Sequence, residues 1–238
     1  MTHTHPVFCA VDTTDISEAQ RLVRSLSGQI GGIKLGLEFF CANGPDGVSR
    51  VMADSNLPLF LDLKLHDIPN TVAGAMKAVA RSEAAMTTIH AAGGGTMIRA
   101  ARDTAESEAA RLTRPRVSIL AVSVLTSLNR DDLVDIGVDG TVSDQVRRLA
   151  ELAQKSGADG MICSPHETAA LRAQCGTDFL LVVPGIRPAW AAANDQKRIM
   201  TPVEAMRSGA SRLVIGRPIT AADDPVAAAR RITEELSA

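Results

Sequence analysis

Short runs of aliphatic and β-branched residues recur along the whole chain. Between these runs, hydrophobic residues return every three or four positions, as at Ile16, Ala19 and Val23, which is typical of the buried face of a helix. The pattern therefore predicts strands that alternate with amphipathic helices. The eight predicted strands cover residues 7–11, 32–35, 59–63, 87–90, 117–124, 160–163, 179–183 and 213–215.

This alternation fits one large α/β domain. Eight strands in 238 residues correspond to 238/8, or about 30, residues per repeat, which is the size of one strand–helix unit. No linker rich in proline, glycine and serine divides the chain, so residues 1–238 are expected to form a single (βα)8 TIM barrel. An open, doubly wound sheet is the alternative, but no G-x-G-x-x-G turn follows the first predicted strand.

Two tetrapeptides have the composition of a helix start. SPHE from Ser164 and TPVE from Thr201 each place a hydroxyl at the N-cap, then proline, then glutamate at the third helical position. Both are predicted to begin helices, and Asp224 followed by Pro225 is predicted to open the last helix in a similar way. The run Gly93 to Gly95 is interpreted as a turn into a helix, with ligand contact as the alternative.

The third predicted strand carries charges where a barrel strand would be apolar. Side chains alternate along a strand, so Asp62 and Lys64 are predicted to point into the barrel mouth while the leucines between them face the helices. Barrel enzymes place their chemistry at this carboxyl end. Lys34 on the second strand and Asp67 on the loop after the third strand complete a set of four charges that sums to zero. Because an unpaired buried charge is costly, these four side chains are expected to pair with one another or with neighbours. A purely structural ion-pair network is the alternative interpretation.

Both inward cations are lysines, although only five of the 25 basic residues of the chain are lysine. An ammonium can give up a proton during a reaction, whereas a guanidinium cannot. A lysine that forms an imine must be neutral, and the carboxylates of Asp62 and Asp67 favour the charged form instead. Lys64 is therefore predicted to be a general acid.

The ends of the last two predicted strands carry a glycine and an arginine each. VPGIRP from Val183 and VIGRPIT from Val214 stand where barrels commonly bind phosphate, which predicts an anion site at Arg187, Gly216 and Arg217. A turn that merely ends a strand is the alternative. Residues 187–200 have no clear strand pattern and are predicted to form a lid. Asp12 ends the first strand and is expected to accept a sugar hydroxyl or to cap a helix.

Charge and composition narrow the range of partners. The chain has 25 basic and 27 acidic residues, and only 3% of its residues are aromatic, with no tyrosine. A net charge of -2 gives no general attraction to nucleic acid or to an anionic membrane, and few aromatic rings are present to stack on bases. We therefore expect no nucleic-acid partner, and any anionic ligand must be held locally.

Two further features predict a cytoplasmic protein. No stretch approaches the roughly 18 apolar residues of a membrane span, and residues 1–6 lack the basic and apolar regions of a signal peptide. The four cysteines, Cys9, Cys41, Cys163 and Cys175, form no C-x-x-C pair. They are expected to be reduced thiols rather than disulfides or metal ligands.

The sequence DLKLHDIPNT from Asp62, together with VPGIRP and IGRPI, resembles the orotidine 5'-phosphate decarboxylase family over essentially the whole chain. The D-x-K-x-x-D core alone also occurs in metal-dependent keto-sugar-phosphate decarboxylases of the same barrel group, but the longer form is close to diagnostic. The resemblance implies that the chain converts orotidine 5'-monophosphate to uridine 5'-monophosphate (UMP) and CO2, the last step of de novo UMP synthesis, without a metal or cofactor.

The same resemblance implies a role for each matching residue. Lys64 would protonate C6 of the pyrimidine, and Asp62 would lie against the substrate carboxylate. Lys34 would hold the set of charged side chains in place and would contact the ribose. Asp67 and Thr71 would act across the interface of a homodimer. The remaining substrate contacts would come from Asp12, Ile68, Thr126, Arg187, Gln196, Gly216 and Arg217.

The predicted lid departs from the family pattern at two positions. The family usually has glycine near Trp190 and at Asn194. The resemblance therefore implies the chemistry of the site but not the rate at which this lid closes.

Overall fold

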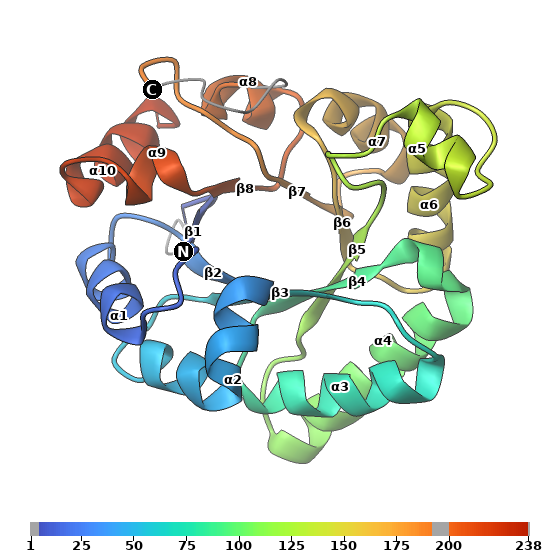
Figure 1. The fold of residues 1–238 in the computed structure, drawn as a ribbon, viewed down its shortest axis with the longest axis horizontal. Coiled ribbons are helices and arrows are strands. Elements are labelled where there is room, and N and C mark those ends of the chain that lie inside the picture. The colour runs from blue at the N-terminus through green and yellow to red at the C-terminus, as the bar shows by residue number, and fades with distance from the viewer. Residues whose placement is uncertain (1–4, 192–199, 238) are drawn as a thin grey trace.

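The computed structural model describes residues 5–191 and 200–237. Eight parallel strands follow one another around a closed barrel, and the last strand pairs with the first, Val7 lying opposite Leu213 (Figure 1). Closure confirms the predicted barrel and contradicts an open sheet, in which the first and last strands would not pair. The strands are β1 (Val7–Ala10), β2 (Gly32–Gly36), β3 (Leu59–Leu65), β4 (Met86–His90), β5 (Ser118–Val122), β6 (Gly160–Ile162), β7 (Leu180–Val183) and β8 (Arg212–Ile215).

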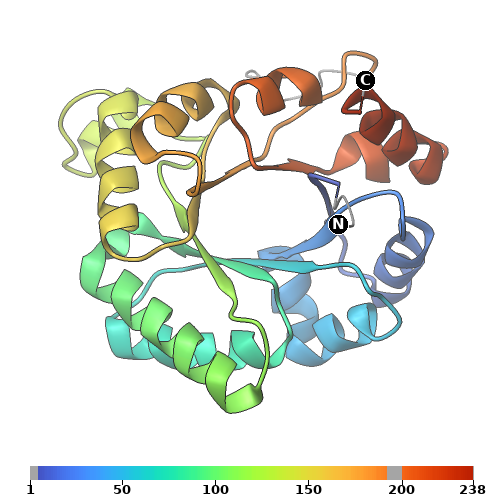
Figure 2. The same cartoon turned by 180° about the vertical axis from the view of Figure 1, so that it is seen from behind.

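Helices surround this barrel as an outer ring, visible from both ends in Figures 1 and 2. Their buried faces match the predicted spacing; in the first helix, Ala19 and Val23 are buried against the sheet. The helices are α1 (Ile16–Ser25), α2 (Leu37–Met52), α3 (Pro69–Arg81), α4 (Gly94–Leu112), α5 (Arg130–Asp135), α6 (Val142–Lys155), α7 (Thr168–Cys175), α8 (Pro202–Arg207), α9 (Arg217–Thr220) and α10 (Pro225–Glu235), with short 3-10 turns η1 (Ala91–Gly93) and η2 (Pro165–Glu167). The turn at η1 leads directly into α4, which confirms the helix-entry interpretation of Gly93 to Gly95.

The barrel interior is filled by its own layer of hydrophobic side chains. Phe8 and Phe60 meet edge to face with ring centroids 6.5 Å apart, and Leu120, Val182 and Val214 pack with them. Such a packed interior is a core and not a pore. It closes the barrel below the mouth and gives any ligand there a rigid, apolar floor.

The predicted helix starts are confirmed in part. Thr201 and Glu204 form a complete capping box, with the Thr201 N–H donating to Glu204 Oε2 at 2.9 Å and the Glu204 N–H to Thr201 Oγ1 at 3.3 Å. At Ser164 the Ser164 N–H donates to Glu167 Oε2 at 2.8 Å, and the Glu167 N–H donates to the Ser164 carbonyl at 3.1 Å. This three-residue spacing makes the segment begin with the 3-10 turn η2 before α7.

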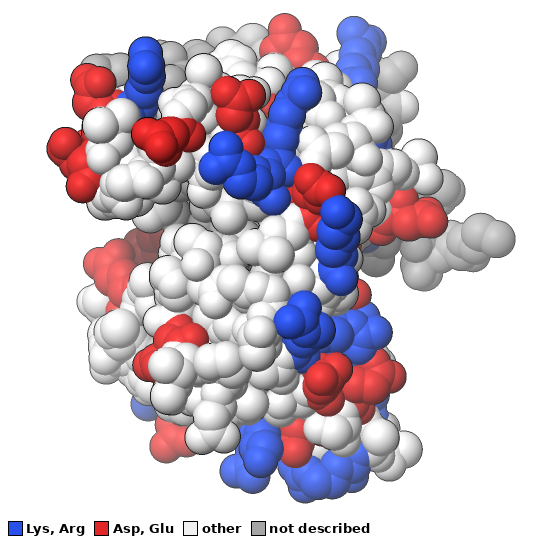
Figure 3. Space-filling model, turned by 90° about the vertical axis from the view of Figure 1, so that its right-hand side faces the viewer, with Lys and Arg blue, Asp and Glu red and all other residues white. Residues whose placement is uncertain are grey.

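The surface carries charges of both signs. On the face shown in Figure 3, Lys and Arg lie interspersed with Asp and Glu around a broad uncharged area. This distribution agrees with the net charge of -2 and shows no single-sign field on that face. Within residues 5–191 and 200–237, no helix is long and apolar enough to cross a bilayer.

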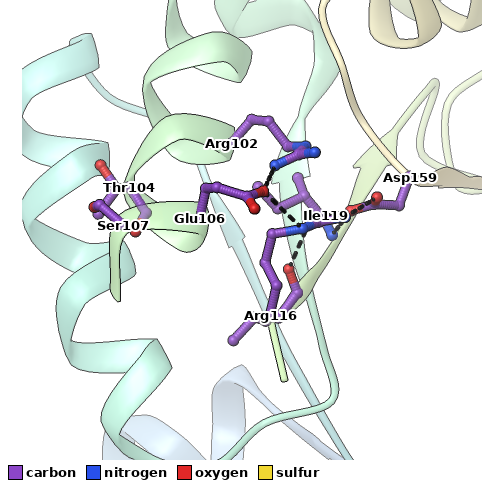
Figure 4. Close-up of polar contacts among 8 residues, drawn as sticks. Arg102, Thr104, Glu106, Ser107, Arg116, Ile119 and Asp159 are labelled. Atoms are coloured by element: carbon purple, nitrogen blue, oxygen red, sulfur yellow. Dashed lines mark hydrogen bonds and ion pairs between the residues drawn. The ribbon is translucent and has the colours of Figure 1, made fainter. Parts of the chain in front are cut away.

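A polar network ties together the amino-terminal ends of β5 and β6 (Figure 4). The Arg116 guanidinium donates to both oxygens of Asp159, at 2.7 and 2.5 Å, and the Ile119 N–H donates to Asp159 Oδ2 at 2.7 Å. Arg102 and Arg116 both contact Glu106. Because Arg116 and Asp159 are mostly buried, this carboxylate holds the register between the two strands at the end of the barrel opposite the mouth.

We expect Asp159→Asn to lower the free energy of unfolding by about 1.5–3 kcal/mol, the usual contribution of hydrogen bonds to a charged group. Urea denaturation monitored by circular dichroism measures this change. Glu151→Gln is the matched control, because it removes an exposed pair with Lys155 on α6 that water screens and that should change stability much less. Equal losses in the two variants would contradict the assigned role of Asp159.

Candidate active site

A cavity of about 320 Å³ opens at the carboxyl ends of the strands. Its floor includes Phe60 and Val214, which belong to the apolar layer that fills the barrel. Charged side chains from several strands surround the space above this floor, as expected for a barrel enzyme. The predicted site residues that line it are Asp12, Lys34, Asp62, Lys64, Thr126, Arg187, Gly216 and Arg217.

Asp62 and Lys64 on β3 both face this cavity, with Lys64 Nζ 2.7 Å from Asp62 Oδ2. The prediction of their position is confirmed, but the regular alternation on which it rested is wrong. The register between β3 and β4 shifts between Leu61 and Leu65, and Lys64 has a φ of 50°. A non-glycine residue in this left-handed region costs about 1–3 kcal/mol, a strain that is typical of functional sites. The bulge aims the lysine at the aspartate.

Thr88 on β4 holds this irregular strand in place. Its hydroxyl accepts the Lys64 N–H at 2.8 Å and donates to Asp62 Oδ1 at 2.7 Å. Thr88 is fully buried, so both bonds form away from water. Sequence reasoning missed Thr88 because threonine is common in buried strands, and only the β3–β4 pairing brings it beside Asp62.

A second ion pair lies on the adjacent strands. Lys34 Nζ on β2 donates to Asp12 Oδ1, just after β1, at 2.9 Å. A Cβ atom at Gly36 would lie 3.0 Å from Lys34 Nζ, so the absence of a side chain there leaves room for the ammonium. The cap of α1 is Asp15, which accepts the Glu18 N–H at 2.9 Å, so the helix-capping alternative for Asp12 is wrong.

The predicted anion site lies across the mouth from Lys64, after β7 and β8. Arg187 is buried, and its N–H donates to the Met200 carbonyl at 3.1 Å, which draws together the two ends of the segment between β7 and α8. Arg217 is the first residue of α9 and follows Gly216 directly. A Cβ at Gly216 would contact Ala10 at 3.4 Å, so the backbone passes close to β1 here.

The structure does not bring Asp67, Ile68 and Thr71 into the cavity of the same chain. Asp67 accepts the Ile68 N–H at 2.6 Å through its own side chain, and it has no ion pair with a lysine in the described part of the chain. Ile68 is 66% exposed, and Thr71 is exposed in the first turn of α3. These residues therefore face outward beside the mouth. Of the four charges predicted to form one network, only Asp62 and Lys64 pair with each other, while Lys34 pairs with Asp12 and Asp67 is left out.

The predicted lid falls partly on residues 192–199, which lie outside the described residues, and this range includes Asn194 and Gln196. The described part before it is anchored on α10. Trp190 Nε1 donates to Glu235 Oε1 at 2.9 Å, and the Arg231 guanidinium lies 4.7 Å from the centre of the indole ring. The tryptophan thus attaches the amino-terminal end of this segment to the last helix.

The cysteines are free thiols, as predicted. Cys163 lines the cavity, but burial raises its pKa to about 12, so the thiol stays protonated near neutral pH. Burial likewise raises the pKa of Cys9 to about 12. Neither thiol is suited to act as a nucleophile, because nucleophilic attack requires the thiolate.

Two histidines lie beside the lysine–aspartate pair. The rings of His66 and His90 are 5.3 Å apart between centroids. Burial, followed by the nearby His66 and Lys64, lowers the pKa of His90 below its ordinary value of 6.5, and Asp62 opposes the shift. His90 is therefore neutral near pH 7 and adds no charge next to Lys64.

The chain is similar to known proteins over nearly its whole length. The model of the "Orotidine 5'-phosphate decarboxylase / HUMPS family" matches residues 5–232. Proteins named orotidine 5'-phosphate decarboxylase from Paramagnetospirillum magneticum and Rhodospirillum rubrum are 59% and 55% identical, each over 98% of this chain and over 98% and 94% of their own length. The crystal structure of orotidine 5'-phosphate decarboxylase from Lactobacillus acidophilus is 38% identical, with a TM-score of 0.85, covering 98% of this chain and 100% of that one.

We expect His90→Gln to remove a pH dependence of stability. The pKa of His90 in the folded chain lies below the ordinary value of 6.5. As the pH falls, the His90 ring is therefore protonated in the unfolded chain before it is protonated in the folded chain, which favours unfolding. The contribution of His90 is complete above about pH 6.5 and is lost as the pH falls toward the folded pKa. The unfolding free energy of the wild type minus that of the variant should therefore shrink between about pH 7.5 and 5.5 in urea titrations, and a constant or growing difference would contradict this assignment.

Proposed function

Because this chain belongs to the orotidine 5'-phosphate decarboxylase / HUMPS family, we propose that it converts orotidine 5'-monophosphate to UMP and CO2, with Lys64 as the proton donor. The family is one of enzymes, the carboxy-lyases. The observation that carries the proposal is the Lys64–Asp62 pair, joined at 2.7 Å inside a cavity whose opposite side carries two arginines.

Loss of CO2 from C6 of the pyrimidine leaves an electron pair in the plane of the ring. The ring cannot delocalise this pair as an enolate would, so stabilisation must come from charges placed beside it. Lys64 would stabilise the developing carbanion and then donate a proton to C6. Asp62 would lie against the substrate carboxylate. Repulsion between the two carboxylates would destabilise the bound substrate relative to the carbanion that forms when CO2 leaves.

This mechanism requires two charges held in place before the substrate arrives. Lys64 donates to Asp62 on one side, and Thr88 donates to the same carboxylate on the other. The bond from the Lys64 N–H to Thr88 fixes the lysine backbone as well. Preorganisation of this kind avoids the cost of reorienting solvent during the reaction.

Binding energy would come from groups distant from C6. Arg187, Gly216 and Arg217 would hold the phosphate, and Gln196 would join phosphate to base from the lid. Contacts far from the reacting carbon can contribute to transition-state stabilisation when they help to enclose the substrate. The ribose would lie against the Asp12–Lys34 pair, and Thr126 would contact the pyrimidine.

The proposed reaction uses no metal or cofactor. In support, Asp12 and Asp62 in the cavity are each engaged by a lysine ammonium, so a divalent cation would have to displace it. The test is to treat the protein with EDTA and to assay it on a keto-sugar phosphate with and without Mg2+. Activity that EDTA removes and Mg2+ restores would contradict the proposal and would indicate a metal-dependent enzyme of the same barrel group.

We further propose that the active form is a homodimer. Asp67, Ile68 and Thr71 are not among the described residues that line the proposed active-site cavity of their own chain, and they are exposed beside its mouth, where a second copy could receive them. The 66% exposure of Ile68 supports a covered position in the dimer. The chain is proposed to act in the cytoplasm as one catalytic domain, and its free cysteines agree with a reducing compartment.

Lys64→Ala should lower kcat by at least about 10³-fold, because it removes both the proton donor and the charge beside C6. The loss of orotidine 5'-monophosphate absorbance, followed after EDTA treatment, measures turnover. Calorimetric titration with UMP should show that binding is retained. Lys77→Ala, on the exposed side of α3, is the matched control and should be fully active. Substantial turnover by Lys64→Ala would refute the assigned donor.

Arg217→Ala should lower kcat/KM by about 10- to 100-fold, the loss expected when charge-assisted contacts to a phosphate are removed. Initial rates at low substrate concentration measure this ratio. Arg230→Ala removes an exposed arginine of α10 and should leave the ratio unchanged. Wild-type kinetics in Arg217→Ala would place this arginine outside the phosphate site.

A further inference from the structure

Trp190 is the single tryptophan of the chain, and it joins the connection after β7 to the end of the last helix, α10 (Figure 1). Its indole N–H donates to Glu235 Oε1 at 2.9 Å, and the Arg231 guanidinium lies over the ring at 4.7 Å from its centre. Arg231 Nε in turn lies 3.7 Å from the same Glu235 oxygen. The indole is therefore held both by its N–H and by its face.

Packing restrains the indole as well. Trp190 is partly buried against the main hydrophobic core, and so are Leu236, which follows Glu235 directly, and Met206 of α8. A ring that is held by packing and by polar contacts together has little freedom to move. Trp190 is thus a fixed point of the backbone, three residues after Arg187.

The backbone of Arg187 lies between this fixed point and a second one. The Arg187 N–H donates to the Met200 carbonyl at 3.1 Å, and Ile186 pairs with Met200 in an isolated β-bridge. On the other side, Pro188 has a restricted φ, and its carbonyl accepts the Ala191 N–H at 3.0 Å in a tight turn. The position of Arg187 therefore depends on both anchors.

The Arg187 side chain is sensitive to this position. Arg187 is only 4% exposed, yet it lines the cavity of the proposed active site. Contacts between a guanidinium and phosphate oxygens require a defined planar geometry. A displacement of about 1 Å, caused by a change away from the ligand, can weaken such contacts strongly.

We propose that Trp190 is a positioning residue for phosphate binding, because its attachment to α10 fixes the backbone from which Arg187 reaches the phosphate of the substrate. This inference rests on the proposed function, in which Arg187 binds that phosphate. Trp190 is not among the described residues that line the cavity, so it acts through Arg187 and not by touching the substrate.

The first test compares two competitive inhibitors, UMP and uridine, which differ only in the phosphate. Trp190→Leu removes the ring and the N–H donor, and it should raise the inhibition constant of UMP about 3- to 10-fold, less than the loss of a whole charge-assisted contact. The inhibition constant of uridine should stay at its wild-type value, because uridine has no phosphate for Arg187 to bind. Inhibition of orotidine 5'-monophosphate turnover measures both constants.

Variants of α10 test the same anchor from the surface, where a change does not disturb the core. Glu235→Ala removes the acceptor of the indole N–H and should also weaken UMP binding, whereas Glu235→Gln keeps an accepting oxygen and should bind UMP like the wild type. Glu234→Ala is the matched control, because this neighbouring glutamate pairs with Arg230. The emission of the single tryptophan should change in Glu235→Ala and not in Glu234→Ala.

A double-variant cycle separates an effect through Arg187 from a general loss of packing. Arg187→Ala should by itself raise the inhibition constant of UMP about 10- to 100-fold. Adding Trp190→Leu to Arg187→Ala should have no further effect, because the side chain that Trp190 positions is then absent.

Three results would overturn the positioning role. These are additive effects of Trp190→Leu and Arg187→Ala, an equal rise of the inhibition constants of UMP and uridine in Trp190→Leu, or wild-type UMP binding in both Trp190→Leu and Glu235→Ala. Wild-type UMP binding in Arg187→Ala would instead overturn the proposed phosphate site, so the two failures are distinguishable.

Discussion

Asp62 is a largely buried carboxylate that receives hydrogen bonds from two side chains at once, the Lys64 ammonium and the Thr88 hydroxyl, each at 2.7 Å. A charge in this position is tolerable only because both partners are present. To supply them, β3 departs from regular geometry, and Lys64 takes a left-handed backbone conformation that Thr88 stabilises. The rest of the site is arranged around this constraint.

The barrel carries the strain because its interior is rigid. Phe8 and Phe60 pack edge to face below the mouth, and strand closure removes the edges at which an irregular strand could slip. At the opposite end, Asp159 and Arg116 hold β5 and β6 in register. The packed interior and this polar network give the mouth a fixed frame on which its two lysine–aspartate pairs are held.

The two sides of the mouth differ in local charge. On the β1 to β3 side, each carboxylate is balanced by a lysine, so the local charge is near zero. After β7 and β8, two arginines provide positive charge that suits a phosphate.

The sequence by itself determined the barrel, the strand positions, and most residues of the mouth, because hydrophobic periodicity is local and the carboxyl ends of barrel strands always converge. Asp62, Lys64, Arg187 and Arg217 were found this way. Only the tertiary structure decided the contacts between strands. The partnership of Thr88 with Asp62, the pairing of Asp12 with Lys34 and the outward position of Asp67 all depend on register and on distances between elements remote in sequence. The alternation of residues along a strand predicts which face of the sheet a side chain lies on. It does not predict a bulge that changes this direction, or the residue on a neighbouring strand with which the side chain forms a hydrogen bond.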